Sequence, residues 1–353
     1  MSRYAYVRGS NQAWSHPAHK RRFPRFARRN GITFSDYVTD MKFGEVNILS
    51  PAADITFWRR EAIKNGRRLV FDANDPFLLS DESSIKEKFR GSFKFLSGQQ
   101  KYFEQSYRDS YKSICESADL VIVGHYAQAD LLKSLAKEVA LIPDYGIETP
   151  VRVKDDYNLS TSKTINIFWE GLGSSFLPFE LLEDIFQPIN EEYNFIFHFV
   201  TDLSFYQYGD MFKKVYIQDL AKKLAPSLHA QFKFYQWSEY MMNQIAISCD
   251  IGIIPLPLDN SMNFWKPENK LIHMWRMALP TITSPIPSYE MAFTGSGKEL
   301  CPKDEDSWRE NILELSNSKS LRRSYGLIGH RHASQAYDDK SIDQKWHDCL
   351  LSL

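Results

Sequence analysis

The sequence has few cysteines, and it lacks the features that mark several classes of protein. Its four cysteines, Cys115, Cys249, Cys301 and Cys349, stand far apart, without the paired spacings that ligate zinc or build a disulfide framework. No apolar run is long enough to span a membrane, the N-terminus carries charges where a signal peptide is apolar, and no repeat or low-complexity tract is visible. We therefore predict a cytoplasmic protein whose cysteines are reduced and structural.

An excess of charge of one sign is also missing. Lysine and arginine together number 43, and aspartate and glutamate number 44, so no net field would draw the chain to a nucleic acid. We predict no nucleic-acid partner. At 353 residues, of which 43% are hydrophobic, the chain is long for one core and suits two domains of ordinary size.

The stretch of residues 250–289 carries the clearest structural pattern. Apolar runs at residues 251–255 and 279–284 predict strands that are buried on both faces, because such strands are continuously apolar. Between them, Pro267 occupies a position typical of a first helical residue, and apolar residues then recur at three- and four-residue spacing. Strand, helix and strand together predict one βαβ crossover unit.

Two lysines, Lys266 and Lys270, stand one helical turn apart at the start of this predicted helix. In βαβ units, ligands bind at the carboxyl ends of the strands, and the free amides and dipole of a helix N-terminus attract anions. The sequence therefore predicts a phosphate or diphosphate ligand at this point, held by the two ammonium groups.

The residues of this stretch also follow a known pattern. The matching positions are Asp250, Gly252, Pro255, Leu256, Asn260, Asn263, Lys266, Lys270, Leu271, Trp275, Leu279, Pro280 and Ser284. In this order they resemble the donor-binding segment of GT-B glycosyltransferases of the family-four type. Two positions depart from that pattern, since His273 replaces the glutamate that usually holds the nucleotide ribose and Ala278 replaces a glycine.

The resemblance implies an α/β protein with two Rossmann-like domains that face each other across a cleft. We expect an acceptor-binding domain over residues 1–150, a nucleotide-sugar-binding domain over residues 151–335, and a C-terminal helix over residues 336–353 that crosses back to the first domain. The resemblance also implies an enzyme that uses no cofactor and no metal ion, with the nucleotide sugar as its substrate.

Other residues of the second half are expected to line the donor site. A Gly-x-Gly loop follows an apolar run at residues 165–169, and glycines let backbone amides approach a phosphate. By the resemblance, this loop faces the two lysines from across the nucleotide, while Trp237 either stacks on the base or packs beneath its loop. The expected donor-binding residues are Gly171, Gly173, Ser174, Trp237, Asn263, His273 and Ser284.

In the first half, Asp72 and Asp75 lie at the end of a predicted strand over residues 68–72. Three interpretations stay open. The stretch is a turn rich in aspartate, asparagine and proline, or a catalytic carboxylate pair that faces the acceptor, or a metal-binding pair of the other glycosyltransferase fold. The third is the weakest, because the spacing is Asp-x-x-Asp and the nucleotide-binding features lie in the other half of the chain.

Three further residues of the first half lie where α/β domains bind ligands. Gly9 and Ser10 follow the predicted first strand, and His125 follows a predicted strand over residues 119–123. We assign all three to the acceptor side. Each also has a structural alternative, since a lone Gly-Ser pair is a weak signal and a histidine at this position more often caps the following helix than it contacts phosphate.

A basic stretch runs from Lys20 to Arg29, with Phe23 and Phe26 among the cations. It is either the solvated face of a helix whose phenylalanines point inward, or a surface that meets an anionic acceptor or lipid headgroups. The repulsion between clustered cations is easier to explain beside something anionic. We therefore include a peripheral contact with the inner membrane face among the predicted partners.

The predicted function is transfer of a sugar from a nucleotide sugar to a glycan or lipid-linked acceptor, in bacterial surface polysaccharide or glycoconjugate synthesis. Lys266 and Lys270 would stabilise the departing diphosphate without a metal. If configuration is retained, as the resemblance implies, the leaving phosphate takes the acceptor proton; if it is inverted, Asp75 or Asp72 is the base. Two alternatives are a nucleotide-sugar epimerase or hydrolase, and a non-catalytic binding module, which the missing helix glutamate at His273 favours.

Overall fold

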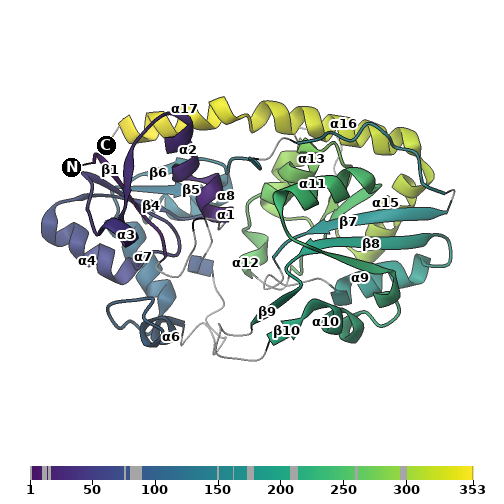
Figure 1. The fold of residues 1–353 in the computed structure, drawn as a ribbon, viewed down its shortest axis with the longest axis horizontal. Coiled ribbons are helices and arrows are strands. Elements are labelled where there is room, and N and C mark those ends of the chain that lie inside the picture. Colours follow the sequence, from purple (N-terminus) through teal and green to yellow (C-terminus); the bar gives the residue numbers. More distant parts are fainter. Residues whose placement is uncertain are drawn as a thin grey trace. The chain divides into compact units, whose positions relative to one another are not determined.

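The computed structural model describes residues 2–9, 14, 17–74, 77–79, 90–148, 151–161, 163–172, 179–206, 214–258, 261–294, 300–351 and 353 (Figure 1). The chain divides into two compact units. The first comprises Met1–Gly146, Asp259–Pro267 and Tyr337–Leu353, and the second comprises Ile147–Leu258 and Glu268–Ala336. The observed boundaries lie close to the predicted ones at residues 150 and 335. The segment Asp259–Pro267 differs, because it was expected in the second domain and belongs to the first unit.

The first unit is built on a six-stranded parallel sheet in the order β2-β1-β3-β4-β5-β6 (Figure 1). Its strands are β1 (Tyr4–Val7), β2 (Phe34–Asp36), β3 (Val46–Leu49), β4 (Arg68–Asp72), β5 (Leu120–Val123) and β6 (Val139–Leu141). All residues of β1, β3 and β5 are buried, as expected for a parallel sheet with helices on both faces. Among these strands, β1, β4 and β5 were predicted from the sequence.

The helices of the first unit begin and end at recognisable signals. They are α1 (Pro17–Arg21), α2 (Phe23–Arg29), α3 (Tyr37–Asp40), α4 (Ile55–Asn65), the 3₁₀ turn η1 (Phe77–Leu79), α6 (Arg90–Leu96), α7 (Tyr107–Ser117), α8 (Tyr126–Leu132), α12 (Ser261–Phe264) and α17 (Asp339–Leu351). At the start of α4, the Asp54 carboxylate accepts hydrogen bonds from the backbone amides of Thr56 and Phe57. At its end, Gly66 adopts the left-handed conformation with φ 60°, which glycine takes at little cost and which commonly ends a helix.

The basic stretch lies in α1 and α2, and α17 packs against α2. Both phenylalanines of the stretch are buried, and the Phe26 ring stacks on Trp346 of α17 with 5.8 Å between centroids. Arg25 and Arg29 each form an ion pair with Asp339, at 2.8 and 3.0 Å. The inward orientation of the phenylalanines is thus observed, and acids of the chain's own C-terminal helix supply part of the negative charge that the cations require.

The second unit is built on a five-stranded parallel sheet in the order β11-β8-β7-β12-β13. Its strands are β7 (Thr164–Glu170), β8 (Asn194–Thr201), β11 (Phe232–Gln236), β12 (Ile251–Ile254) and β13 (Thr281–Thr283), and β9 (Ser204–Tyr206) and β10 (Lys214–Tyr216) form a separate antiparallel pair. The predicted crossover over residues 250–289 is confirmed, since β12 runs into α13 (Asn269–Arg276) and then into β13, parallel to β12. The helix begins at Asn269 rather than at Pro267.

Helices of the second unit pack on this sheet and on one another. Besides α13 they are α9 (Phe179–Phe186), η2 (Gln187–Ile189), α10 (Ile217–Leu224), η3 (His229–Gln231), α11 (Glu239–Ser248), α14 (Pro287–Thr294), α15 (Glu305–Asn317) and α16 (Lys319–Ala336). Two glycines let α16 approach α13 closely. A Cβ at Gly329 would lie 2.6 Å from the Trp275 ring, and one at Gly326 would lie 2.2 Å from the Ala278 carbonyl oxygen.

We expect Gly329→Ala to lower the thermal midpoint of unfolding, although alanine favours a helix over glycine by about 1 kcal/mol. The new methyl group would meet the buried Trp275 ring, so α16 would have to move away from α13, and overpacking of this kind costs about 1–3 kcal/mol. Circular dichroism during heating measures the effect. Ser324→Ala, at an exposed position of the same helix, is the matched control, and a midpoint that rises for Gly329→Ala would contradict the close packing.

Candidate functional site

In the second unit, Lys270 lies in the first turn of α13 and reaches the carboxyl end of β7. Its ammonium group is 4.7 Å from the centre of the Trp169 ring, and a Cβ built on Gly171 would lie only 2.6 Å from Nζ. The absence of a side chain at position 171 is therefore what lets the cation lie directly against the backbone. Two predicted site residues, Gly171 and Lys270, are thus neighbours in space.

Glu170, the last residue of β7, lies among three of the predicted donor residues. Its side chain is only 5% exposed. One carboxylate oxygen accepts a hydrogen bond from Nε1 of Trp237 at 3.3 Å, and the other lies 3.8 Å from Nδ1 of His273. Glu170 was not among the site residues predicted from the sequence. The available signal was a charged residue directly after an apolar strand, at the edge where parallel strands bind ligands.

A second buried carboxylate belongs to Glu268, which directly precedes the first helical residue of α13 and makes no side-chain capping hydrogen bond to that helix. Burial, followed by the charges of Glu268 and Glu170, raises the pKa of the Tyr289 phenol, so these acids share one neighbourhood. The second unit therefore gathers two carboxylates, an imidazole, a lysine ammonium and an indole at the ends of β7 and α13. Such a mixed set can bind both an anionic group and hydroxyl groups.

The Ser284 side chain is hydrogen-bonded to the protein backbone. Its hydroxyl accepts from the backbone amide of Leu256 at 2.7 Å and donates to the carbonyl of the same residue at 3.0 Å, which ties the segments after β12 and β13 together. Asn263 and Lys266 lie in the part of the chain grouped with the first unit, where the Lys266 backbone amide donates to the Asn263 carbonyl at 3.2 Å. The remaining predicted donor residues, Gly173 and Ser174, lie outside the described residues.

In the first unit, Asp72 is engaged by a buried arginine. Nη2 and Nε of Arg22 donate to its two carboxylate oxygens at 2.6 and 2.9 Å, and Nη1 donates to Asp144 at 3.0 Å and to the Ile142 carbonyl at 2.7 Å. Burial alone would lower the pKa of Arg22, but the charges of Asp72 and Asp144 outweigh burial and raise it, so the guanidinium stays charged.

This geometry corrects the assignment of Asp72 as a candidate catalytic base. Its side chain is 1% exposed and both oxygens already accept from Arg22, so no acceptor hydroxyl can reach them. Asp72 instead joins the carboxyl end of β4 to the segment after β6. Asp75, the other candidate, lies outside the described residues.

His125 precedes α8, but its side chain does not cap that helix. Its Nε2 donates to the Trp265 carbonyl at 2.7 Å, and Gln128 donates to the same oxygen at 3.2 Å and to the Asn74 carbonyl at 3.1 Å. Burial lowers the pKa of the imidazole, an effect that the hydrogen bond to Trp265 partly offsets. A neutral His125 thus holds the segment Asp259–Pro267 in the first unit, which is a structural role different from the one expected.

The remaining acceptor-side residue in view is Gly9, which is buried just after β1, while Ser10 lies outside the described residues. Within the described ranges, no group of three or more histidine, cysteine, aspartate or glutamate side chains is placed to bind a metal ion. None of the helices that the structure describes combines the length and the apolar character needed to cross a bilayer.

Comparison with known proteins defines the fold. No protein-family model matches this chain, and no curated protein sequence does. Solved structures match it well in shape: the chain has the GT-B fold, an α/β architecture of two Rossmann-like domains.

Three similar structures illustrate the match. TarM is 12% identical with a TM-score of 0.60 over 86% of this chain. Sucrose-phosphate synthase of Thermosynechococcus elongatus is 13% identical with a TM-score of 0.60 over 93%. HepE of Anabaena, in complex with UDP and glucose, is 14% identical with a TM-score of 0.57 over 97%. The chain spans 54% of the TarM chain, 77% of the synthase and 85% of HepE.

We expect Asp72→Asn to destabilise the protein by about 3–5 kcal/mol, because it leaves the Arg22 guanidinium buried without its main counter-charge. Urea unfolding followed by tryptophan fluorescence measures the loss. Asp130→Asn is the matched control, since that carboxylate is 62% exposed in its pair with Lys133 and surface pairs contribute at most about 1 kcal/mol. Equal stabilities of wild type and Asp72→Asn would show that the pair is not the structural link described above.

Proposed function

We propose that the protein is a glycosyltransferase that moves a sugar from a nucleotide-sugar donor to a glycan or lipid-linked acceptor. The observation that carries the proposal is the Lys270 ammonium lying against Gly171 at the carboxyl end of β7. Two solved structures of similar fold also support the proposal. They are HepE in complex with UDP and glucose, and the pneumococcal O-GlcNAc transferase GtfA in complex with UDP and GlcNAc. Their ligands are of the chemical class that this site would bind.

The chemical step places negative charge where the cation lies. When the bond between the sugar and the nucleoside diphosphate breaks, charge develops on the phosphate oxygens, and a fixed ammonium with free helix amides stabilises it. Lys270 and the first amides of α13 supply both in the second unit. Lys266 is the proposed second cation, with Asn263 beside it, and Gly171, Gly173 and Ser174 form the loop that approaches the phosphates.

The nucleotide hydroxyls need a hydrogen-bond acceptor, and Glu170 is the proposed one. The resemblance places a helix glutamate at the ribose, and this chain has His273 there. Glu170 brings a carboxylate to within 3.8 Å of that imidazole, so the pair can receive a vicinal diol. Trp237 holds the carboxylate through its ring N–H and leaves its ring available to the base.

We further propose a retaining, metal-independent reaction in bacterial surface polysaccharide or glycoconjugate synthesis. The engagement of Asp72 by Arg22 favours retention, because it removes one of the two candidate bases and leaves the leaving diphosphate to take the acceptor proton. Asp75 remains the base to test if the reaction inverts. Activity that persists at full rate after treatment with EDTA and gel filtration is the expected result, and restoration by Mg²⁺ or Mn²⁺ of a lost activity would contradict metal independence.

A cytoplasmic location, with peripheral contact to the inner membrane face through the basic stretch, stays part of the proposal. Three of its arginines, Arg22, Arg25 and Arg29, have carboxylate partners within the chain. A membrane contact would depend on cations at the surface of the stretch, and the Arg28 residue is exposed.

We expect a nucleoside diphosphate to raise the thermal midpoint of the wild-type protein and Lys270→Ala to lose most of that increase. Binding at 100 times the dissociation constant adds about 2.7 kcal/mol of stability, and removal of one preorganised charge partner lowers turnover about 100- to 1000-fold. A thermal-shift panel of UDP, GDP, ADP, TDP and CMP identifies the base, and nucleotide release from the matching sugar donors measures turnover.

Lys222→Ala, at an exposed position on α10, is the matched control and should behave as wild type. A panel in which no nucleotide shifts the midpoint would refute the proposed function. Normal turnover by Lys270→Ala would refute the assigned role of that lysine.

A further inference from the structure

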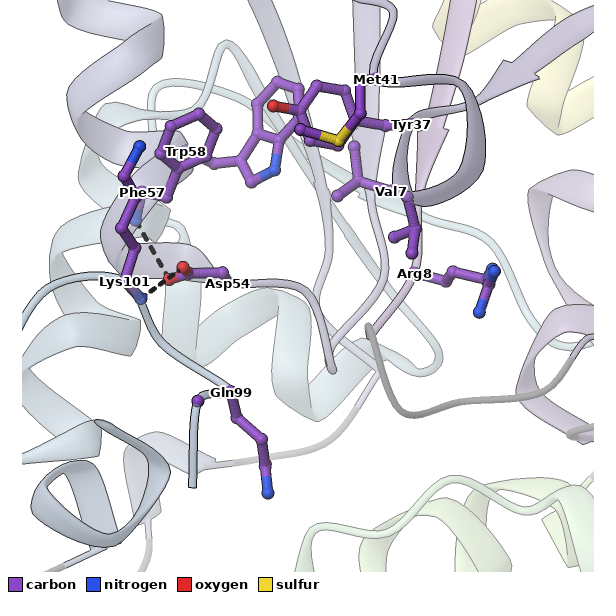
Figure 2. Close-up of a pocket in the computed structure, with 11 residues that line it drawn as sticks. Val7, Arg8, Tyr37, Met41, Asp54, Phe57, Trp58, Gln99 and Lys101 are labelled. Carbon is purple, nitrogen blue, oxygen red and sulfur yellow. Dashed lines mark hydrogen bonds between the residues drawn. The ribbon is translucent and has the colours of Figure 1, made fainter. Parts of the chain in front are cut away.

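The first unit contains a cavity of about 310 Å³ that the proposed donor site does not use (Figure 2). It lies beside the carboxyl end of β1, where Val7 and Arg8 form part of its wall. This volume is at the lower end of the range of pockets that bind small molecules, which suits one ring or a short chain rather than a large cofactor.

Aromatic side chains form one side of this cavity. Tyr37, Phe57 and Trp58 come from α3 and α4, and the Tyr37 and Trp58 rings meet edge to face with centroids 4.7 Å apart. Trp58 also contacts Phe57 at 5.8 Å. Because these rings hold one another in place, the cavity offers a rigid apolar wall to a ligand.

The same wall contains a hydrogen-bond donor without a partner. Trp58 is 2% exposed, and its indole N–H donates to no acceptor among the described residues. Figure 2 shows the indole nitrogen directed into the space framed by Asp54 and Val7. An indole N–H that opens onto a cavity can donate to water or to the oxygen of a bound ligand, so the cavity can accept a ligand that brings an oxygen acceptor.

A second donor lies beside the Phe57 ring (Figure 2). Asp54 both caps α4 and accepts from the Lys101 backbone amide at 2.7 Å, which fixes the 99–101 segment beside the helix (Figure 2). The Lys101 ammonium then lies 4.7 Å from the Phe57 ring centre and has no carboxylate partner among the described residues. It adds up to three N–H donors to the rim.

From this combination we infer that the cavity binds one sugar ring of the acceptor. A sugar ring offers an apolar C–H face to the aromatic wall and oxygen atoms to Trp58 and Lys101, whereas a hydrocarbon chain would dehydrate both donors without replacing their hydrogen bonds. The acceptor is therefore a glycan rather than the lipid part of a lipid-linked substrate. Sugar binding follows from the cavity alone, and its role as acceptor rests on the proposed function.

Saturation-transfer NMR on the full chain tests this inference, with methyl glycosides of glucose, galactose, mannose and N-acetylglucosamine as sugar probes and farnesyl phosphate as the lipid probe. We expect at least one glycoside to bind, and Trp58→Phe and Lys101→Met each to weaken it about two- to tenfold, the effect of one lost hydrogen bond. Gln99→Trp, which fills the opening, should abolish binding. Lys64→Met, at an exposed position of α4, should have no effect.

Circular dichroism is the control that checks whether each variant is folded. Lys101 and Lys64 are exposed, so we expect their substitution to leave the fold intact. Three results would overturn the inference: no glycoside binds, a glycoside binds equally well to all variants, or only farnesyl phosphate binds. The nucleotide panel separates this failure from that of the proposed function, since a protein that binds UDP or GDP but no glycoside would keep its donor assignment.

Discussion

The contact between the Lys270 ammonium and the Gly171 backbone determines what the second unit can do. A Cβ at position 171 would lie 2.6 Å from Nζ and 2.6 Å from the Trp169 ring, so the ammonium or the ring would have to shift. A parallel sheet gathers its strand ends at one edge, so a cation fixed at that edge meets whatever ligand the helix amides of α13 attract. Gly171 leaves room for the Lys270 ammonium, and the direction of β7 places both residues at the edge of the sheet where ligands bind.

The same neighbourhood buries carboxylates, which is costly unless each has a partner. Glu170 has the Trp237 ring N–H and the His273 imidazole close by, and Glu268 is placed at the positive end of a helix. The carboxylates of Glu170 and Glu268 are buried in the same part of the second unit as the Lys270 ammonium, where apolar residues would be less costly to bury. Under the proposed function, the same arrangement would let Glu170 offer a carboxylate to a diol beside His273.

How much of this was predictable depends on how far apart the interacting residues stand in the chain. The β12–α13–β13 crossover was predictable because apolar runs and helix signals are local patterns. The Arg22–Asp72 pair joins the segment between α1 and α2 to β4, and the sequence shows only two acids, Asp72 and Asp75, at a strand end, which resembles a ligand site. Likewise, the basic stretch pairs with acids of α17 at the other end of the chain. The sequence shows the cluster of cations but does not show that these distant acids lie beside it in the fold.

Two tryptophans show how one rule of burial leads to opposite conclusions in the two units. In the second unit, Trp237 donates its ring N–H to Glu170, so its polar atom is satisfied within the protein. In the first unit, the Trp58 N–H reaches a cavity and meets no acceptor among the described residues, although the side chain is almost completely buried. Because this N–H opens onto the cavity, water or the oxygen of a ligand can accept from it, and the aromatic wall beside it favours a ligand with an apolar face and oxygen atoms at its edge.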